Sequence, residues 1–475
     1  MRMLKNISKP IVLVAFALNL GACSDFLDLE NANSLDVGTT VKDLPSLTNA
    51  ANGVYSGFQS AGYYNRTFIL LPDLMTDNAF VSRQNVGFYT NYDALEVNNQ
   101  DGYAQGAWAS MYGVIANANL AIASGERLNL NPAQQGTANQ IIGEMYAARA
   151  LAHFDLVRFF AKPYNATADA SHLGVPVITE PQTEIISPSR NTVQQVYTQI
   201  IKDLEKAIQL MAPNGEKYRK NGRFTPDAAK ALLSKAYLYM EDWAEAERYA
   251  TEVISGGTYS LLPTNQYQNS WRFDFSTESI FEIENTNVDK AGVNGIGMMY
   301  EQGQYGDILT TADLYNTYSL TDVRRTLIQV GRRGVDNPAY IVHKYPKGLS
   351  TQDDNIKVLR LAEVYLIRAE ARAEQGKSNL AQDDLYEVMR RADPTALKVL
   401  LTGEELVDRI LLERRKELAF EGNRLFDLTR KKKDVTLIRA TSSEVIPYND
   451  DRLVLPIPIA EINANPNIEQ NPGYL

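Results

Sequence analysis

Cysteine and histidine, two residue types that often carry out catalysis or bind metals, are scarce in this chain of 475 residues. It has one cysteine, Cys23, and three histidines, His153, His172 and His343, which lie far apart in the sequence. A single cysteine excludes an intramolecular disulfide and a cysteine-based metal site. The histidines do not have metal-ligand spacing. We therefore predict no metal site, and the position of Cys23 near the N-terminus points to a different reaction, acylation of its thiol.

Sequence motifs that place reactive groups on turns and helices are also missing. There is no G-x-x-x-x-G-K-[ST], H-E-x-x-H or G-x-S-x-G pattern. Gly292, Gly295 and Gly297 are close together but lack the strand–turn–helix context of a dinucleotide-binding loop. A glycosidase needs only two carboxylates, and 57 acidic residues leave that possibility open. We predict a protein without catalytic activity or cofactor, and a surface hydrolase remains an alternative.

The N-terminus has the parts of a secretory signal that ends in a lipidated cysteine. Three basic residues and no acidic residue precede an apolar run over residues 11–18. That run is too short to cross a bilayer as a helix. The next segment, Leu20–Cys23, resembles a bacterial lipobox, in which cleavage precedes the cysteine. We expect residues 1–22 to be a signal peptide, Cys23 to carry a covalent lipid, and residues 23–37 to form an acidic tether. An ordinary secretory signal with a chance cysteine is the alternative.

Charge and hydropathy restrict what the mature chain can bind. The net charge is −10, and removing residues 1–22 leaves 44 basic residues against 57 acidic ones, a net charge of −13. Such an acidic protein is a poor candidate for binding nucleic acid or an anionic membrane surface. No other stretch approaches transmembrane length. Membrane contact is expected through the lipid alone, since about two acyl chains give stable anchoring.

Apolar periodicity predicts a mainly helical body. In residues 139–160, apolar side chains recur every three or four positions on two faces, which is typical of a helix covered on both sides. His153 falls within this pattern, and we assign it to core packing. Thr192 and Gln195 have the spacing of a capping box at the start of a helix over residues 192–211.

Pairs of helices with small residues at their contact recur along the chain. Thr225 and Pro226 start one pair, which turns at Glu241. A second pair turns at Gly376. Two helices in about 34 residues are the signature of a tetratricopeptide repeat. We predict an all-α fold of irregular repeat pairs near residues 139–211, 225–255, 357–392 and 402–430.

Two long segments, residues 60–106 and 260–320, interrupt these helices. They are rich in Gly, Asn, Asp, Ser, Tyr and Phe, and most of their length has no clear helical period. Loops longer than about 15 residues in compact domains are usually functional or disordered. Their aromatic content argues against disorder. We therefore predict loop-rich, ligand-binding insertions within one domain over residues 38–475.

The last hundred residues carry the most specific patterns. Residues 410–430 read ILLERRKELAFEGNRLFDLTR, a charged helix that Gly422 ends before a second short one. Thr402 and Glu405 have capping-box spacing at its start. Four prolines in the terminal segment LPIPIAEINANPNIEQNPGYL argue against a regular helix or central strand. A tail this apolar is expected to pack on the body.

Six segments, in this order, resemble the SusD/RagB family of outer-membrane nutrient-binding lipoproteins. The resemblance covers essentially the whole mature chain. No single segment is decisive, and the family is assigned because all six occur in the right order. The segments are the lipobox, WASMYGVIANANLAI at 108–122, GEMYAARALAHFDLVRFFAKPY at 143–164 with GVPVI at 174–178, SPSRNTVQQVY at 187–197, ERRKELAFEGNRLFDLTR at 413–430 and EINANPNIEQNPGY at 461–474.

The resemblance implies a fold of about eight helices, arranged as four tetratricopeptide pairs beside a loop-rich part. It also implies a lipoprotein on the outer face of the outer membrane that binds oligosaccharides without catalysis. Its partner would be a SusC-like TonB-dependent barrel transporter, to which it delivers the sugar. The same scaffold capturing peptides or another nutrient is the second hypothesis, and a tetratricopeptide adaptor that binds only proteins is the third.

Family members place an arc of aromatic side chains on the loop-rich part, which locates the candidate site. The C–H face of a pyranose packs on an aromatic ring, while polar side chains bind the hydroxyl rim. The matching segments are residues 77–103, which include Tyr103, and 271–305. Trp108 and Tyr112, four residues apart on a predicted helix, are assigned to structure, as is Trp243. The ligand-binding candidates are Asp77, Asn78, Phe80, Phe88, Tyr89, Tyr92, Trp271, Phe273, Tyr300 and Tyr305.

Overall fold

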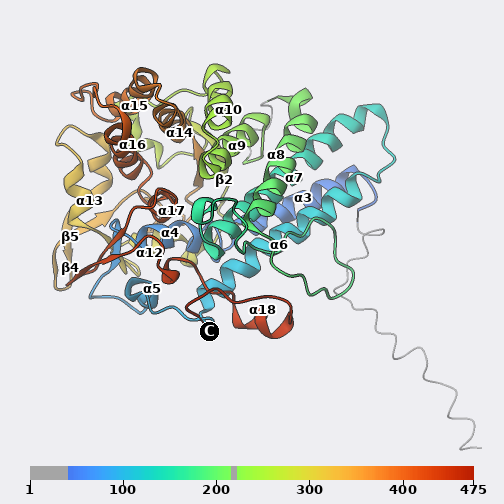
Figure 1. Cartoon of the computed structure of the whole chain (residues 1–475), viewed down its shortest axis with the longest axis horizontal. Helices are drawn as coiled ribbons and strands as arrows, with labels where there is room; N and C mark the ends of the chain where they lie inside the picture. The colour runs from blue at the N-terminus through green and yellow to red at the C-terminus, as the bar shows by residue number, and fades with distance from the viewer. Residues whose placement is uncertain (1–40, 216–221, 475) are drawn as a thin grey trace, which may run out of the picture.

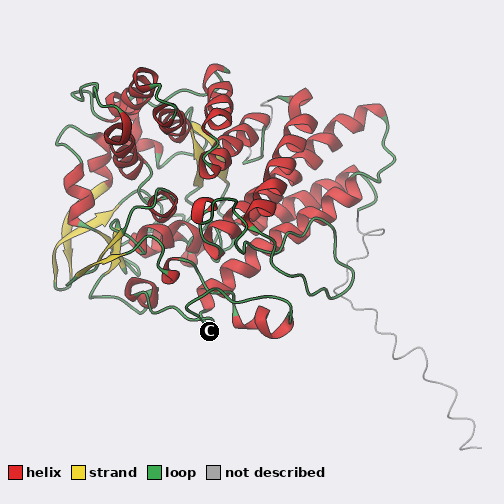
Figure 2. Ribbon diagram, in the orientation of Figure 1, coloured by secondary structure: helices red, strands yellow, loops and turns green. Residues whose placement is uncertain are grey.

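The computed structural model describes residues 41–215 and 222–474 (Figure 1). The predicted signal peptide, Cys23 and the tether lie outside the described residues. Helices make up most of the body and strands are few and short (Figure 2), which confirms the prediction of a mainly helical fold.

The long helices pack in chain order, each against the next. Because each helix covers its neighbour, the row forms one continuous layer of the molecule. Its helices are α3 (Leu44–Phe58), α6 (Gly102–Gly125), α7 (Pro132–Phe160), α8 (Val193–Met211), α9 (Pro226–Met240), α10 (Trp243–Ser255), α14 (Leu361–Glu374), α15 (Ser378–Ala392) and α16 (Gly403–Glu417).

Capping residues set two helix starts where the sequence predicts them, at Thr192 and Thr225. The Thr192 side chain accepts from the backbone N–H of Gln195 in a reciprocal capping box, as predicted. Helix α7 starts earlier than residue 139, because Asn131 caps it and a proline follows. The capping box predicted at Thr402 does not form. Gly403, with a φ of 54°, turns the backbone off the helical path directly after that threonine.

Three of the four predicted helix pairs are present, and the fourth differs. Helices α7 and α8, α9 and α10, and α14 and α15 pack as expected. In residues 402–430, α16 packs on α14 and α15, whereas α17 (Arg424–Arg430) packs on α4 (Thr67–Leu74). Instead, α3 pairs with α6 across an insertion that separates them in sequence. Repeat period alone does not show such a split pair.

The two insertions are more ordered than their composition predicts, because they fold on each other. Strands β1, β3, β5 and β4 form an antiparallel sheet in the order β1-β3-β5-β4, and Ala79 of the first insertion pairs with Thr310 of the second. Strand β2 pairs with β6, and β7 with β8. The strands are β1 (Ala79–Val81), β2 (Ser279–Ile283), β3 (Ile308–Thr310), β4 (Ile328–Arg333), β5 (Asp336–Val342), β6 (Ile356–Arg360), β7 (Val435–Ile438) and β8 (Ser443–Ile446).

Short helices complete the connecting segments and the C-terminal tail. The tail packs on the body, since Leu455 donates its N–H to the carbonyl of Phe159. Its prolines do not exclude a helix, because Pro458 precedes the first residue of α18 and needs no N–H there. The short helices are α5 (Thr90–Ala94), α11 (Thr264–Ser270), α12 (Ile296–Tyr300), α13 (Ala312–Thr317), α18 (Ile459–Ala464) and the 3₁₀ turns Tyr164–Ala166, Ala212–Asn214, Gly292–Asn294, Val323–Leu327 and Asp451–Leu453.

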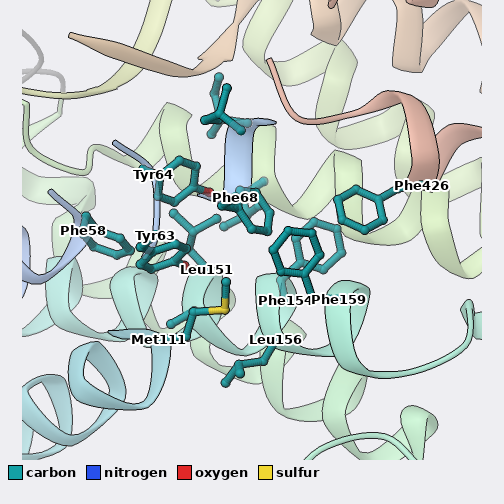
Figure 3. Close-up of a cluster of buried hydrophobic side chains, with 14 of the residues drawn as sticks. Phe58, Tyr63, Tyr64, Phe68, Met111, Leu151, Phe154, Leu156, Phe159 and Phe426 are labelled. Atoms are coloured by element: carbon teal, nitrogen blue, oxygen red, sulfur yellow. The ribbon is translucent and has the colours of Figure 1, made fainter. Parts of the chain in front are cut away.

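An aromatic core joins the helical layer to the insertions (Figure 3). Phe68 of α4 contacts Phe159 of α7 and Phe426 of α17, with ring centroids 4.8 and 6.1 Å away. His153 of α7 is fully buried, as predicted, and burial lowers its pKa to about 3. It is therefore neutral at physiological pH and has a structural role.

Candidate functional site

Four of the predicted ligand-contacting rings, Tyr89, Tyr92, Trp271 and Tyr300, are at most 5% exposed. The Trp271 ring lies among cations, with the Nζ of Lys344 4.4 Å from its centroid. The Tyr300 ring stacks on Tyr345, with centroids 6.2 Å apart. Trp271 and Tyr300 therefore use their faces for packing and offer none to a ligand, a correction to their predicted role.

Asp77 and Asn78 are also occupied by the protein itself. The Asp77 carboxylate accepts two hydrogen bonds from Arg424, at 2.8 and 2.7 Å. Burial raises the pKa of this carboxyl, but the Arg424 guanidinium outweighs burial and holds the pKa below its usual value. Asn78 donates to Asp73 and accepts from Arg415. This pair ties the end of α4 to the 413–430 segment, which corrects its predicted role in ligand binding.

The remaining candidates of the first segment meet one residue from the second. The half-buried ring of Phe88 lies beside that of Tyr305, with centroids 4.8 Å apart. The guanidinium carbon of Arg66 lies 5.8 Å from the ring centroids of Phe88 and Tyr103. We call Phe88, Tyr103, Tyr305 and Arg66 the aromatic platform. Its three rings are all partly exposed.

The buried rings of Tyr89 and Tyr92 pack against the platform ring of Tyr103. The Tyr89 ring stacks on that of Tyr103, with centroids 4.0 Å apart and an angle of 24°. Burial raises the pKa of Tyr89 to about 12, so its hydroxyl stays neutral, and it bonds with Thr67. Tyr92 donates to Asp101, which also caps α6. These two predicted contacts thus act by fixing Tyr103.

Buried polar groups hold the two platform segments together. The fully buried Asp307 carboxylate accepts from the backbone N–H of Val86 at 3.1 Å. Burial raises the pKa of Asp307, and the N–H groups of Val86 and Phe88 oppose that rise. Arg333 donates to the carbonyls of Gln84 and Tyr305. The rings of Phe88 and Tyr305 are therefore positioned before any ligand arrives.

Phe80 and Phe273 lie apart from the platform. Phe80 packs on the sheet cluster of Leu309, Ala339 and Ile341. Phe273 is 66% exposed, its backbone N–H donates to the carbonyl of Ser270 at 3.3 Å, and its own carbonyl accepts from Lys357 at 3.4 Å. In the described part of the chain, no ring contact joins Phe273 to the platform.

Sequence reasoning missed a groove beside α6. A groove of about 630 Å³ is lined by Trp108 and Tyr112 of α6, by segment 176–188 and by α18. Trp108 donates to Glu461 at 3.3 Å, and Tyr112 donates to the carbonyl of Pro176 at 2.8 Å. These bonds support the predicted structural role of the two rings. The spacing of the aromatic pair was the available signal, but the groove walls come from distant segments.

The platform has the composition of a sugar-binding surface. Ring faces accept the C–H face of a pyranose, and the guanidinium donates hydrogen bonds to oxygen atoms. Among residues 41–215 and 222–474, no three His, Cys, Asp or Glu side chains cluster as metal ligands. The arrangement supports reversible binding.

Comparison with known proteins places this fold in a family. A family model described as starch-binding and associating with the outer membrane matches residues 25–238, and a SusD family model matches residues 330–474. The structure of a SusD superfamily protein from Bacteroides thetaiotaomicron is 30% identical, with a TM-score of 0.83, and the match covers 90% of this chain and 99% of that one. The chain belongs to the SusD family.

Two further relatives agree with that assignment. A SusD superfamily protein from Bacteroides vulgatus is 29% identical, with a TM-score of 0.83, covering 91% of this chain and 100% of its own. SusD-like protein P2 of Formosa agariphila is 25% identical over 98% of this chain and 99% of its own length. Members of the SusD family bind carbohydrate and associate with the outer membrane. Within the described residues, no helix is both long and apolar enough to cross a bilayer.

Proposed function

We propose that this SusD-family protein is a cell-surface lipoprotein that binds oligosaccharides on the aromatic platform and delivers them to a TonB-dependent outer-membrane transporter. The observation that carries the proposal is the pairing of Phe88 with Tyr305 beside Arg66. The family description, starch-binding and associating with the outer membrane, supports the ligand class and location. The lipobox ending at Cys23 supports the anchor.

We also propose that the ligand leaves chemically unchanged. Ring faces and a guanidinium hold a sugar, but a guanidinium stays charged and does not transfer protons near neutral pH. The neighbouring Asp307 carboxylate is buried, and both of its oxygens accept from the backbone N–H of Val86. Incubating the protein with oligosaccharides and separating the products by chromatography tests this point, since released fragments would support the hydrolase alternative.

Calorimetric titration against an oligosaccharide panel tests the site. Replacing Phe88 or Tyr305 by alanine should weaken binding about five-fold each, because a ring contact contributes on the order of 1 kcal/mol. Phe273→Ala, which removes an exposed ring elsewhere, should leave affinity unchanged. Tyr112→Ala probes the groove on α6. Loss of binding in Tyr112→Ala, with both platform variants unaffected, would move the site to that groove.

Partner purification separates the broader alternatives. Co-purification of a barrel transporter with the tagged, lipidated protein is expected if the protein delivers nutrients. Binding of peptides without any oligosaccharide would favour the same scaffold with another cargo. Association with proteins lacking a barrel, and with no small ligand bound, would favour the tetratricopeptide adaptor.

A further inference from the structure

Arg66 is a buried cation without a carboxylate partner. It is 9% exposed, and in the described ranges 41–215 and 222–474 no carboxylate lies within ion-pair distance of it. Its Nε has no hydrogen-bond partner there either. Arg190 is equally buried and also lacks a carboxylate, but it donates to four backbone carbonyls. In the same ranges Arg66 makes no such bonds to carbonyls, and the hydroxyl of Tyr89, with which its guanidinium interacts, carries no charge.

Other buried arginines in this protein show what Arg66 lacks. Arg360 binds three glutamates, and Arg430 binds Glu370 and Asp427. Around Arg66 there are rings instead, with Phe88, Tyr89 and Tyr103 centroids at 5.7–5.8 Å. Ring faces offset only part of the cost of removing a guanidinium from water. The charge of Arg66 is therefore incompletely balanced.

The position of Arg66 connects this charge to the ligand surface. Two of its three neighbouring rings, Phe88 and Tyr103, are partly exposed and belong to the aromatic platform. A second cation, Arg333, donates to the carbonyl of Tyr305, with Asp307 only at 3.8 Å. A ligand seated on Phe88 therefore lies beside the Arg66 guanidinium, which can pair with an anion.

We infer that the platform selects acidic oligosaccharides, in which a carboxylate or sulfate group on the sugar pairs with Arg66. This inference rests on the proposed function, because it names the class of sugar that the same site takes. The rings hold the pyranose face, and the anionic group of the sugar supplies the counter-charge that Arg66 lacks. Neutral sugars would use the rings alone and bind more weakly.

Matched ligand pairs test the charge directly. One arm compares oligogalacturonides with their carboxyl-reduced, neutral counterparts of the same linkage. The other arm compares a sulfated oligosaccharide with its desulfated form. Calorimetry on the wild-type protein should show at least ten-fold tighter binding of the acidic member of one pair, and the arm that responds identifies carboxylate or sulfate.

Variants then assign that preference to Arg66. Arg66→Gln should weaken the acidic ligand at least ten-fold and leave the neutral one unchanged, while Arg66→Lys should retain part of the preference. Arg272→Gln, at an exposed arginine, is the matched control and should have no effect. Thermal melting monitors folding. If Arg66→Gln does not fold, the Arg66→Lys variant and the salt dependence of wild-type binding carry the test.

Several outcomes would overturn the inference. Equal affinity for the acidic and the neutral member of each pair would show that the site does not distinguish ligands by charge. The proposed glycan-binding function would still stand. Equal loss of acidic and neutral binding in Arg66→Gln would show that Arg66 only supports the rings. Absence of binding to any oligosaccharide by the wild-type protein would refute the proposed function and this inference together.

Discussion

Asp354 shows how burial of a single carboxyl changes its charge. Burial raises its pKa to about 7. The backbone N–H of Lys347, which donates to both carboxyl oxygens at 3.1 Å, opposes that rise. Asp73 is a second such group, with a pKa raised to about 6 by burial. Arginine partners do the reverse at Asp427, where Arg414 and Arg430 outweigh burial and lower the pKa to about 2.

The raised pKa of Asp354 predicts a pH-dependent contribution to stability. Between the unfolded pKa near 3.9 and the folded pKa of about 7, the folded chain holds a proton that the unfolded chain releases. The free energy of unfolding therefore falls as pH rises through this window. Asp354→Asn mimics the protonated acid, so its stability relative to wild type should rise between pH 5 and pH 8, by on the order of 1 kcal/mol after allowing for solvent screening.

Denaturant unfolding at the two pH values checks this prediction. Asp383→Asn is the control, since that side chain is 60% exposed, and its effect should be small at both pH values. An Asp354→Asn variant whose difference from wild type stays constant between pH 5 and pH 8 would contradict the assigned pKa.

At the scale of elements, one glutamate of α16 anchors three segments. The carboxylate of Glu417 pairs with Arg324 at 3.0 Å, Arg360 at 2.8 Å and Arg391 at 2.6 Å. These arginines belong to the turn before β4, the end of β6 and helix α15. Burial raises the pKa of Glu417, and the three guanidinium groups reverse that shift and hold it well below its usual value.

Removing this charge should be far more costly than removing an exposed one. Glu417→Gln leaves buried guanidinium groups without full compensation, so we expect a loss of about 3–5 kcal/mol in unfolding free energy. Glu404→Gln on the same helix removes a side chain that is 84% exposed and 3.5 Å from Lys433, and should cost at most about 0.5 kcal/mol. Urea denaturation measures both, and similar small losses would show that the α16 network does not anchor these segments.

Local signals and long-range contacts explain which elements the sequence predicts. Thr192 and Thr225 cap their helices through atoms three residues away, so spacing alone locates them. Burial of Trp271 and Tyr300 depends on side chains from distant segments, which composition does not reveal. The pairing of Phe88 with Tyr305 likewise needs Asp307 and the sheet between the insertions. Both rings were named from sequence, but their contact was not.

At the scale of the whole molecule, helix α5, which begins two residues after Phe88, lies away from the N-terminal end of α3. Figure 1 shows α5 and the β4–β5 hairpin at one end and the N-terminal end of α3 near the α6–α7 turn at the other. The segment from Cys23 to α3 can reach at most roughly 70 Å when fully extended. The proposed lipid anchor would therefore join the chain at a different part of the molecule from the proposed ligand site.

This separation predicts that the anchor can be removed without loss of binding. Cys23→Ala removes the thiol that takes the lipid, and one end-attached anchor is the membrane contact proposed here. The variant should shift from the membrane fraction to the soluble fraction and lose incorporation of labelled palmitate. Its affinity for oligosaccharide should equal that of the wild-type protein, because the Phe88–Tyr305 contact does not involve the segment before α3. Membrane retention of Cys23→Ala without any label would refute lipid anchoring, and reduced affinity would show that the two ends are coupled.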